Sequence, residues 1–377
     1  MRLQQRWNYI KKSPKLFYNI AFKGRYHYQF DLMDIKTENM SLAKRVNLLK
    51  SGLNLFYRKL YPWSWPIHMQ AEFTNYCNLR CTVCPTGTGI LNRKPQTMPP
   101  ALFRRLLDEV GPYLLTLSLW GWGESLLHPN LAEMLSIVQN RGITTFVSTN
   151  GQNLDNPKVI QALIDYPPTY LIVALDGLTD ETNSIYRVGA KLTPALNGVR
   201  RIAELKKQRR QKYPILHHRF IVMKHNEHEL PRIKQFGYDN GFDMSTIRTL
   251  FTIHSPDITS HQSLVPDNQT LRAYEYKNGE RINRKDFVCE EVFIFPSVFA
   301  DGTVVSCCQD ADGQFPFGNL TGNSSFVDIW WGEKAAEIRG SIRDNNANIS
   351  FCRNCPFRDR QVADCSIQRY DLRRYDI

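Results

Sequence analysis

Three absences narrow the class of this 377-residue protein. No run of about 18 uncharged apolar residues occurs, so a transmembrane helix is not predicted. The basic N-terminus lacks a continuous apolar stretch, and we therefore predict no secretory signal. Acidic residues are scarce at the start of the chain, where residues 1–66 hold three of them against thirteen Lys or Arg. Most of the net charge of +12 therefore lies in this segment, and the remainder is nearly neutral.

The nine cysteines are the most informative residues that are present. In a chain without an export signal they favour metal binding in the reducing cytoplasm over disulfides. Cys77, Cys81 and Cys84 fall within "CNLRCTVC", which contains no histidine. A structural zinc site needs four ligands, usually in two pairs. This loop offers three, so it predicts a thiolate site with one open position.

Residues 67–250 alternate short apolar runs with longer helical patterns such as 100–110, 130–142 and 193–208. This alternation predicts parallel strands joined by helical crossovers, an α/β fold with a partial, six-unit (β/α) TIM-like barrel. Active sites of such barrels collect at the carboxyl ends of the strands, and "CNLRCTVC" directly follows the first strand. The six predicted strands span residues 67–73, 114–120, 143–149, 170–176, 215–223 and 244–250.

Polar and glycine-rich turns follow the other strands at the same end of the barrel. "GWGES" (121–125) follows the second strand, "STNG" (148–151) the third, and "DG" (176–177) ends the fourth. Each turn alone has a composition that is common in loops and does not indicate a ligand site. Because they share one rim, they predict a ligand site built from Gly121, Gly123, Glu124, Ser148, Asn150 and Asp176.

A C-x-x-x-C-x-x-C loop after the first strand of such a barrel resembles the radical S-adenosylmethionine (radical SAM) superfamily. The resemblance implies a 4Fe-4S cluster on Cys77, Cys81 and Cys84, whose open iron chelates SAM. It also implies that "GWGES" binds the methionine amino group and that "STNG" contacts ribose and carboxylate. Asp176 would hold ribose or cap a turn, and Arg187 would face the SAM carboxylate. SAM would be cleaved reductively, and the 5′-deoxyadenosyl radical would abstract hydrogen from a substrate.

The C-terminal region is predicted to be a small α+β, cysteine-rich domain. Residues 251–285 are rich in polar residues and proline and are predicted as a linker, and residues 286–377 hold the remaining cysteines. This domain resembles the SPASM/twitch extension of radical SAM enzymes, with an Asp301–Gly302 hairpin and a late C-x-x-C. The resemblance implies an auxiliary 4Fe-4S cluster on Cys289, Cys307, Cys352 and Cys355.

Two cysteines and one aspartate near the auxiliary site are left without a ligand role. The family spacing favours Cys307 over Cys308 as the ligand, and Cys365 is an ordinary thiol or a substrate-side residue. Asp310 is interpreted as a hydrated surface residue. The alternative for the whole site is zinc held by four cysteines, because the ligand count is the same.

Residues 1–66 are predicted to be a basic, aromatic and amphipathic segment. In residues 41–60 the apolar side chains recur in steps of three and four, which predicts one helical stripe. The stripe either packs on the protein's own body or lies on an anionic membrane surface. It consists of Leu42, Val46, Leu49, Leu53, Phe56 and Leu60.

We therefore expect a cytoplasmic radical SAM enzyme, of oxidoreductase type and peripheral at most to a membrane. The alternative is a non-catalytic, zinc-binding, cysteine-rich protein. The catalytic acid or base is not identified, and no nucleic-acid partner is predicted. The substrate is a small molecule, glycan or peptide; the lack of a separate peptide-recognition domain favours the first two. The electron would come from an external donor such as flavodoxin or ferredoxin.

Overall fold

A curved ten-stranded sheet forms the centre of the protein. The computed structural model describes residues 14–251, 262–282, 287–362 and 364–373. The strand order is β13-β12-β11-β3-β4-β5-β6-β7-β8-β14, and the six strands from β3 to β8 pair in parallel. The predicted partial barrel is thereby confirmed. Its strands are β3 (His68–Ala71), β4 (Thr116–Ser118), β5 (Thr144–Thr149), β6 (Tyr170–Ala174), β7 (Ile215–Val222) and β8 (Met244–Thr249).

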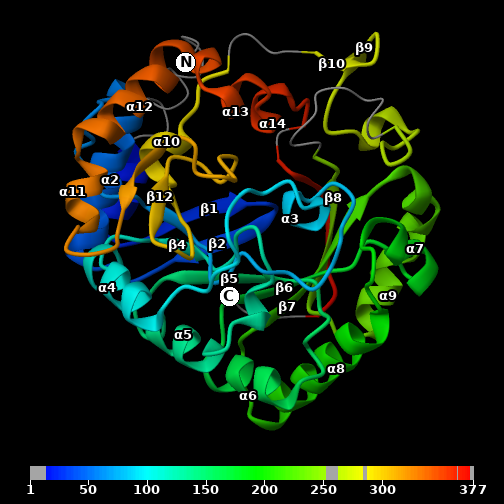
Figure 1. The fold of residues 1–377 in the computed structure, drawn as a ribbon. Helices are drawn as coiled ribbons and strands as arrows, with labels where there is room; N and C mark the ends of the chain where they lie inside the picture. Colours follow the sequence, from blue (N-terminus) through cyan, green and yellow to red (C-terminus); the bar gives the residue numbers. More distant parts are fainter. Residues whose placement is uncertain (1–13, 252–261, 283–286, 363, 374–377) are drawn as a thin grey trace.

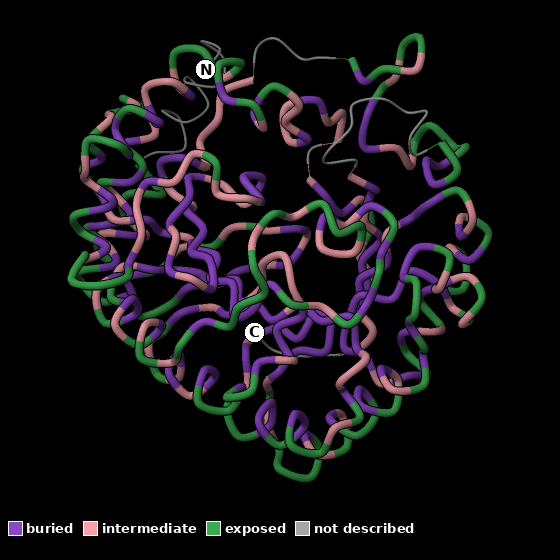
Figure 2. Tube along the Cα trace, in the orientation of Figure 1, coloured by how far each residue is buried: buried purple, intermediate pink, exposed green. Residues whose placement is uncertain are grey.

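The crossover helices cover the convex face of this sheet (Figure 1). In α4 (Pro100–Val110), Phe103, Leu106, Leu107 and Val110 are buried, which is the spacing of one helix face. Figure 2 shows the resulting pattern, with buried strands inside and the outer sides of the helices exposed. The other helices on this face are α5 (Leu131–Ile137), α6 (Pro157–Asp165), α7 (Asp180–Tyr186), α8 (Leu192–Gln208) and α9 (Ile233–Asp239).

The C-terminal region extends the barrel sheet at both edges. β11 (Ser297–Val298) pairs in parallel with β3, and β12 (Thr303–Val305) and β13 (Pro316–Asn319) follow in antiparallel order. At the opposite edge, β14 (Ser366–Asp371) pairs antiparallel with β8. The C-terminal helices are α10 (Glu291–Ile294), α11 (Phe326–Trp330), α12 (Glu333–Asn345), α13 (Ser350–Arg353) and α14 (Pro356–Asp359).

An N-terminal hairpin fills the inside of the barrel. β1 (Tyr26–Phe30) and β2 (Met33–Thr37) pair antiparallel, and Met33 and Ile35 pack against inward side chains such as Ile172. Tyr28 and Phe30 are partly buried against the same cluster, so part of the aromatic content of residues 1–66 belongs to the barrel interior. Trp7 and Tyr9, which also contribute to the aromatic content of this segment, lie outside the described residues.

The helix expected in residues 41–60 is α2 (Leu42–Tyr57), but most of its apolar stripe does not pack on the body. Leu42 is 72% exposed and Leu53 is 53% exposed, whereas Leu49 and Leu60 are half-buried. The helix begins at Ser41, whose hydroxyl accepts a hydrogen bond from the Lys44 amide.

The predicted linker carries short elements of its own. β9 (Tyr276–Lys277) and β10 (Glu280–Arg281) form a small hairpin, while residues 252–261 and 283–286 lie outside the described residues. Within the described parts of the chain, no helix has the length and apolarity needed to cross a membrane.

Candidate active site

The loop that carries Cys77, Cys81 and Cys84 is fixed to the segment after α7. The Arg80 amide donates to the Val188 carbonyl at 3.1 Å, and the Thr82 amide donates to the Tyr186 carbonyl at 3.2 Å. A short helix, α3 (Pro85–Thr88), begins directly after Cys84.

The environment of these thiols is apolar. The loop packs on Met223 and Leu250, which line the top of the barrel interior. Burial raises the pKa of the Cys81 thiol to about 11. A bare thiolate is therefore disfavoured here, and the site suits cysteines that are ionised by binding a positively charged metal.

Glu124 and Asn150 connect the second and third motifs to this loop. Glu124 is 3% exposed; its carboxylate accepts from the Asn150 amide at 2.7 Å and from the Leu126 amide at 3.1 Å. The Asn150 side-chain amide donates to the Asn78 side chain at 2.8 Å and to the Cys77 sulfur at 3.7 Å. Burial raises the pKa of Glu124, and the hydrogen bond from Asn150 partly offsets this. Three motifs that are distant in sequence thus converge at one point on the rim.

The glycines of "GWGES" are required by close packing within the protein. A Cβ atom on Gly121 would overlap the side chain of Glu72, and one on Gly123 would overlap the backbone of Thr74. The expectation from sequence was an approach of the backbone to a ligand. The structure shows a nearer reason, because the loop lies directly against the continuation of β3.

Asp176 orients Arg187 toward the cysteine loop. The Arg187 Nε atom donates to Asp176 Oδ2 at 2.6 Å, and the Ile221 amide donates to Oδ1 at 2.7 Å. Burial alone would lower the pKa of Arg187, but the charge of Asp176 raises it above its ordinary value. Both Asp176 oxygens bind protein donors, so positioning Arg187 is its structural role here, and its ribose contact stays a prediction. Ser148 is half-buried on β5, two residues before Asn150.

Four cysteines from three separate segments line one narrow, mostly apolar pocket. Cys289 precedes α10, Cys307 follows β12, and Cys352 and Cys355 lie at α13 and the start of α14. Cys308 does not line this pocket, and its carbonyl accepts from Trp122. The four are the cysteines that the SPASM resemblance implies as auxiliary ligands.

The two cysteine sets are spaced more widely than the ligands of one tetrahedral zinc ion. Thiolates at about 2.3 Å from one tetrahedral zinc stand only ~3.8 Å apart. Across the described residues, neither cysteine set forms a group of three ligand atoms that all lie within 4.8 Å of one another. A cubane spreads its ligands further, because each thiolate binds a different iron.

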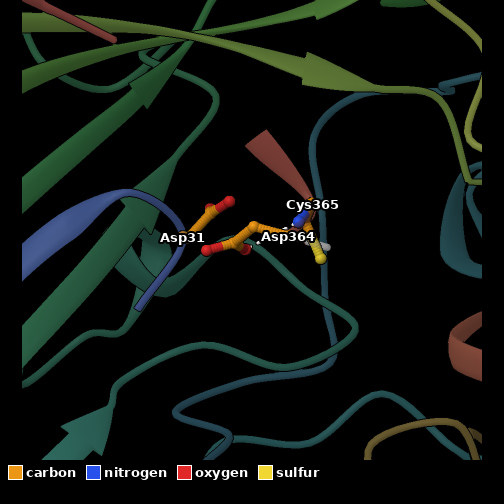
Figure 3. A group of neighbouring side chains, drawn as sticks. All are labelled: Asp31, Asp364 and Cys365. Carbon is orange, nitrogen blue, oxygen red and sulfur yellow. Dashed lines mark hydrogen bonds between the residues drawn. The ribbon is translucent and has the colours of Figure 1, made fainter. Parts of the chain in front are cut away.

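A group that does meet the 4.8 Å limit lies at the tip of the N-terminal hairpin, namely Asp31, Asp364 and Cys365 (Figure 3). Asp31 already pairs with Arg219 at 2.6 Å and with Arg248 at 3.2 Å. Burial alone would raise the pKa of Asp31, but the two guanidinium groups hold it well below its usual range. The carboxylate is thus neutralised by protein cations, and the group does not fit a metal ion.

Sequence reasoning missed Glu72 as the residue that joins the barrel to the C-terminal strands. Its buried carboxylate accepts from both terminal nitrogens of Arg93, at 2.7 and 2.8 Å, and from the Trp122 amide at 2.9 Å. It also accepts from the Ala300 amide at 3.3 Å. The sequence feature that could have identified Glu72 was a carboxylate directly after a buried strand. Asp310, expected on the surface, is 2% exposed and accepts from the Gln314 and Phe315 amides, so that interpretation is wrong.

Two family models match the chain. Residues 71–236 match the radical SAM superfamily, and residues 289–356 match SPASM, an iron-sulfur cluster-binding domain. The chain thus contains a radical SAM domain and a SPASM domain. These domains imply a 4Fe-4S cluster that acts with SAM, and auxiliary iron–sulfur binding.

Curated relatives resemble the chain over most of its length, and solved structures share its fold. The chain is 23% identical to a tungsten-containing aldehyde ferredoxin oxidoreductase cofactor-modifying protein of Pyrococcus furiosus, over 78% of this chain and 88% of that protein. It is 24% identical to the PqqA peptide cyclase of Gluconobacter oxydans, over 81% and 87%. The structure of Streptococcus suis SuiB bound to its precursor peptide SuiA superposes with a TM-score of 0.58 at 15% identity, over 95% of this chain and 84% of SuiB. At that identity the likeness shows the fold alone.

Proposed function

We propose that this protein uses SAM and an auxiliary cluster to modify a peptide at an unactivated C–H bond. The observation that carries the proposal is the hydrogen bonding of Asn150, which joins the Glu124 motif to the Cys77 loop. The similarity to PqqA peptide cyclase supports a peptide substrate, in place of the small molecule or glycan that the lack of a peptide-recognition domain favours. Oxidation, crosslinking and rearrangement are the candidate outcomes.

In this proposal each rim residue has a defined task. Cys77, Cys81 and Cys84 hold the first cluster, and Glu124 binds the SAM ammonium group. Arg187, fixed by Asp176, presents its terminal nitrogens to the SAM carboxylate. When bound, the cofactors supply reductive cleavage of SAM and hydrogen abstraction from the substrate by the 5′-deoxyadenosyl radical.

The auxiliary cluster is assigned to Cys289, Cys307, Cys352 and Cys355. Trp122 belongs to "GWGES", and its indole nitrogen donates to the carbonyl of Cys308, the residue after the proposed ligand Cys307, at 3.1 Å. The substrate would bind between the two cluster sites, inside the barrel mouth.

The proposed setting is a reducing compartment, the cytoplasm, with flavodoxin or ferredoxin as electron donor. All nine cysteines are free thiols, which supports this setting.

Anaerobic reconstitution tests the proposal. The reconstituted protein, supplied with SAM and dithionite, should release 5′-deoxyadenosine, and candidate peptides should raise that rate. A modified peptide should lose hydrogen on oxidation or crosslinking, or keep its mass but change its fragmentation pattern on rearrangement. A colourless protein that binds zinc and yields no 5′-deoxyadenosine would establish the alternative, a zinc-binding protein without catalysis. Serine replacements of Cys308 and Cys365 serve as controls, because neither residue lines the auxiliary pocket.

A further inference from the structure

Helix α2 is held to the protein by its polar side. Four of its five buried residues are polar, namely Lys44, Asn47, Ser51 and Asn54, which are all at most 5% exposed; the fifth is Leu48, at 6%. The Lys44 ammonium donates to the Arg141 carbonyl at 3.2 Å, and Asn47 accepts from the Trp65 amide at 2.8 Å. A surface helix normally does the reverse and turns its apolar stripe to the core.

The apolar stripe of α2 therefore faces outward. At about 100° per residue, Leu42, Val46 and Leu53 point roughly opposite to Ser51. They are 72%, 42% and 53% exposed, and Phe56 and Tyr57 continue the row at 37% and 57%. This row runs the length of the helix, and its burial on the body is excluded by the polar contacts on the other side.

Aromatic side chains extend the row at both ends of α2. Trp63 is 47% exposed and its ring lies 5.6 Å from that of Tyr57. At the other end, Phe22 is 69% exposed; the preceding turn is fixed to α2 by Arg45, which donates to the Ala21 carbonyl. We name the residues Phe22, Leu42, Val46, Leu53, Phe56, Tyr57 and Trp63 the α2 face.

The charges around the α2 face select its partner. Lys50 on α2 is exposed, Lys59 just after it lies over the Trp63 ring, and Lys15 and Lys23 in the preceding segment are also exposed. Residues 14–66 contain three acids, of which Asp31 is buried in the barrel. A second copy of the chain would bring the same cations face to face, which is unfavourable. An apolar and aromatic row flanked by lysines matches an anionic lipid surface, with apolar side chains at the acyl boundary and ammonium groups at the phosphates.

We propose that the α2 face docks the protein on anionic membranes. The helix lies parallel to the bilayer and does not cross it. This inference does not depend on the proposed catalytic function, because none of its residues touches either cluster site.

Sedimentation with vesicles tests the inference. The full chain should bind vesicles of phosphatidylglycerol and phosphatidylcholine at low salt, bind pure phosphatidylcholine weakly, and dissociate as salt rises. The variant Leu42→Gln/Leu53→Gln/Phe56→Gln should bind at least about tenfold more weakly. The matched control Tyr166→Gln/Tyr238→Gln changes exposed apolar residues on α6 and α9 and should bind like wild type.

A second pair of variants isolates the charge contribution. Lys50→Gln/Lys59→Gln should weaken binding and flatten its salt dependence, whereas Lys158→Gln/Lys234→Gln on α6 and α9 should not. All variants should keep the wild-type melting temperature and iron content, because the changed side chains are exposed. Equal binding by wild type and the α2 variant would overturn the inference, as would no binding to anionic vesicles. A concentration-dependent dimer abolished by the α2 variant would overturn it too, since the face would then join two copies.

Discussion

The barrel and the N-terminal segment bury their side chains in opposite ways. In α4 the periodic apolar face is the buried face, whereas in α2 the polar face is buried and the periodic apolar face is exposed. Inward side chains of the barrel strands form an interior cluster, and Met33 and Ile35 of the N-terminal hairpin pack into it. The difference teaches that periodicity identifies an apolar face but not the surface it meets.

The largest effect is expected from the cysteines at the rim of the barrel. Cys77→Ala, Cys81→Ala and Cys84→Ala should each reduce 5′-deoxyadenosine formation to background. Two remaining thiolates would not hold the cluster that is proposed to bind SAM. Product quantification by chromatography measures the effect. Full activity in any of the three would show that the loop is not the cluster site.

Removing the buried carboxylate of the hairpin inside the barrel should cause a large loss of stability. Asp31→Ala leaves Arg219 and Arg248 without their buried partner and should cost about 3–5 kcal/mol of the free energy of unfolding. The exposed pair offers a control: Asp165→Ala, which removes the partner of Arg209, should cost under about 1 kcal/mol. Urea denaturation measures both, and equal losses would mean that the hairpin contact contributes no more than a surface pair.

The same aspartate predicts a pH dependence. Because the folded protein lowers the pKa of Asp31, its contribution is complete above the unfolded pKa of about 3.9 and declines as the pH falls below it. Asp31→Asn should therefore be less stable than wild type at pH 7, and the difference should shrink below about pH 4. Urea midpoints between pH 3 and pH 7 record the trend; a constant difference would contradict it.

A smaller effect is expected at the arginine that Asp176 orients. If Arg187 binds the SAM carboxylate as proposed, Arg187→Lys removes a planar, two-nitrogen contact and should weaken SAM binding about 10–100-fold. Arg80→Lys, on the exposed side of the same loop, is the control and should leave binding unchanged. Equilibrium dialysis with labelled SAM distinguishes the two, and a normal affinity in Arg187→Lys would remove this residue from the site.

Much of the barrel and its rim could be predicted from sequence. The six strands have local apolar signatures, and the motifs at their ends have short-range spacing that does not depend on packing. The burial of Asp310 could not be predicted in this way. The two backbone amides that donate to its carboxylate follow it in a turn with no distinctive composition. The same holds for Glu72 and Asp31, since their partners lie far along the chain. The outward orientation of α2 depends on the neighbours of Lys44 and Asn47, which no periodicity reveals.

Iron and sulfide content after anaerobic reconstitution tests the central claim most directly. Wild type should bind about eight irons, and the triple variant Cys77→Ala/Cys81→Ala/Cys84→Ala about four, because the auxiliary cysteines line a separate pocket. Cys308→Ala and Cys365→Ala should leave the wild-type count unchanged. A triple variant that binds no iron and takes up zinc instead would contradict the account of two cluster sites.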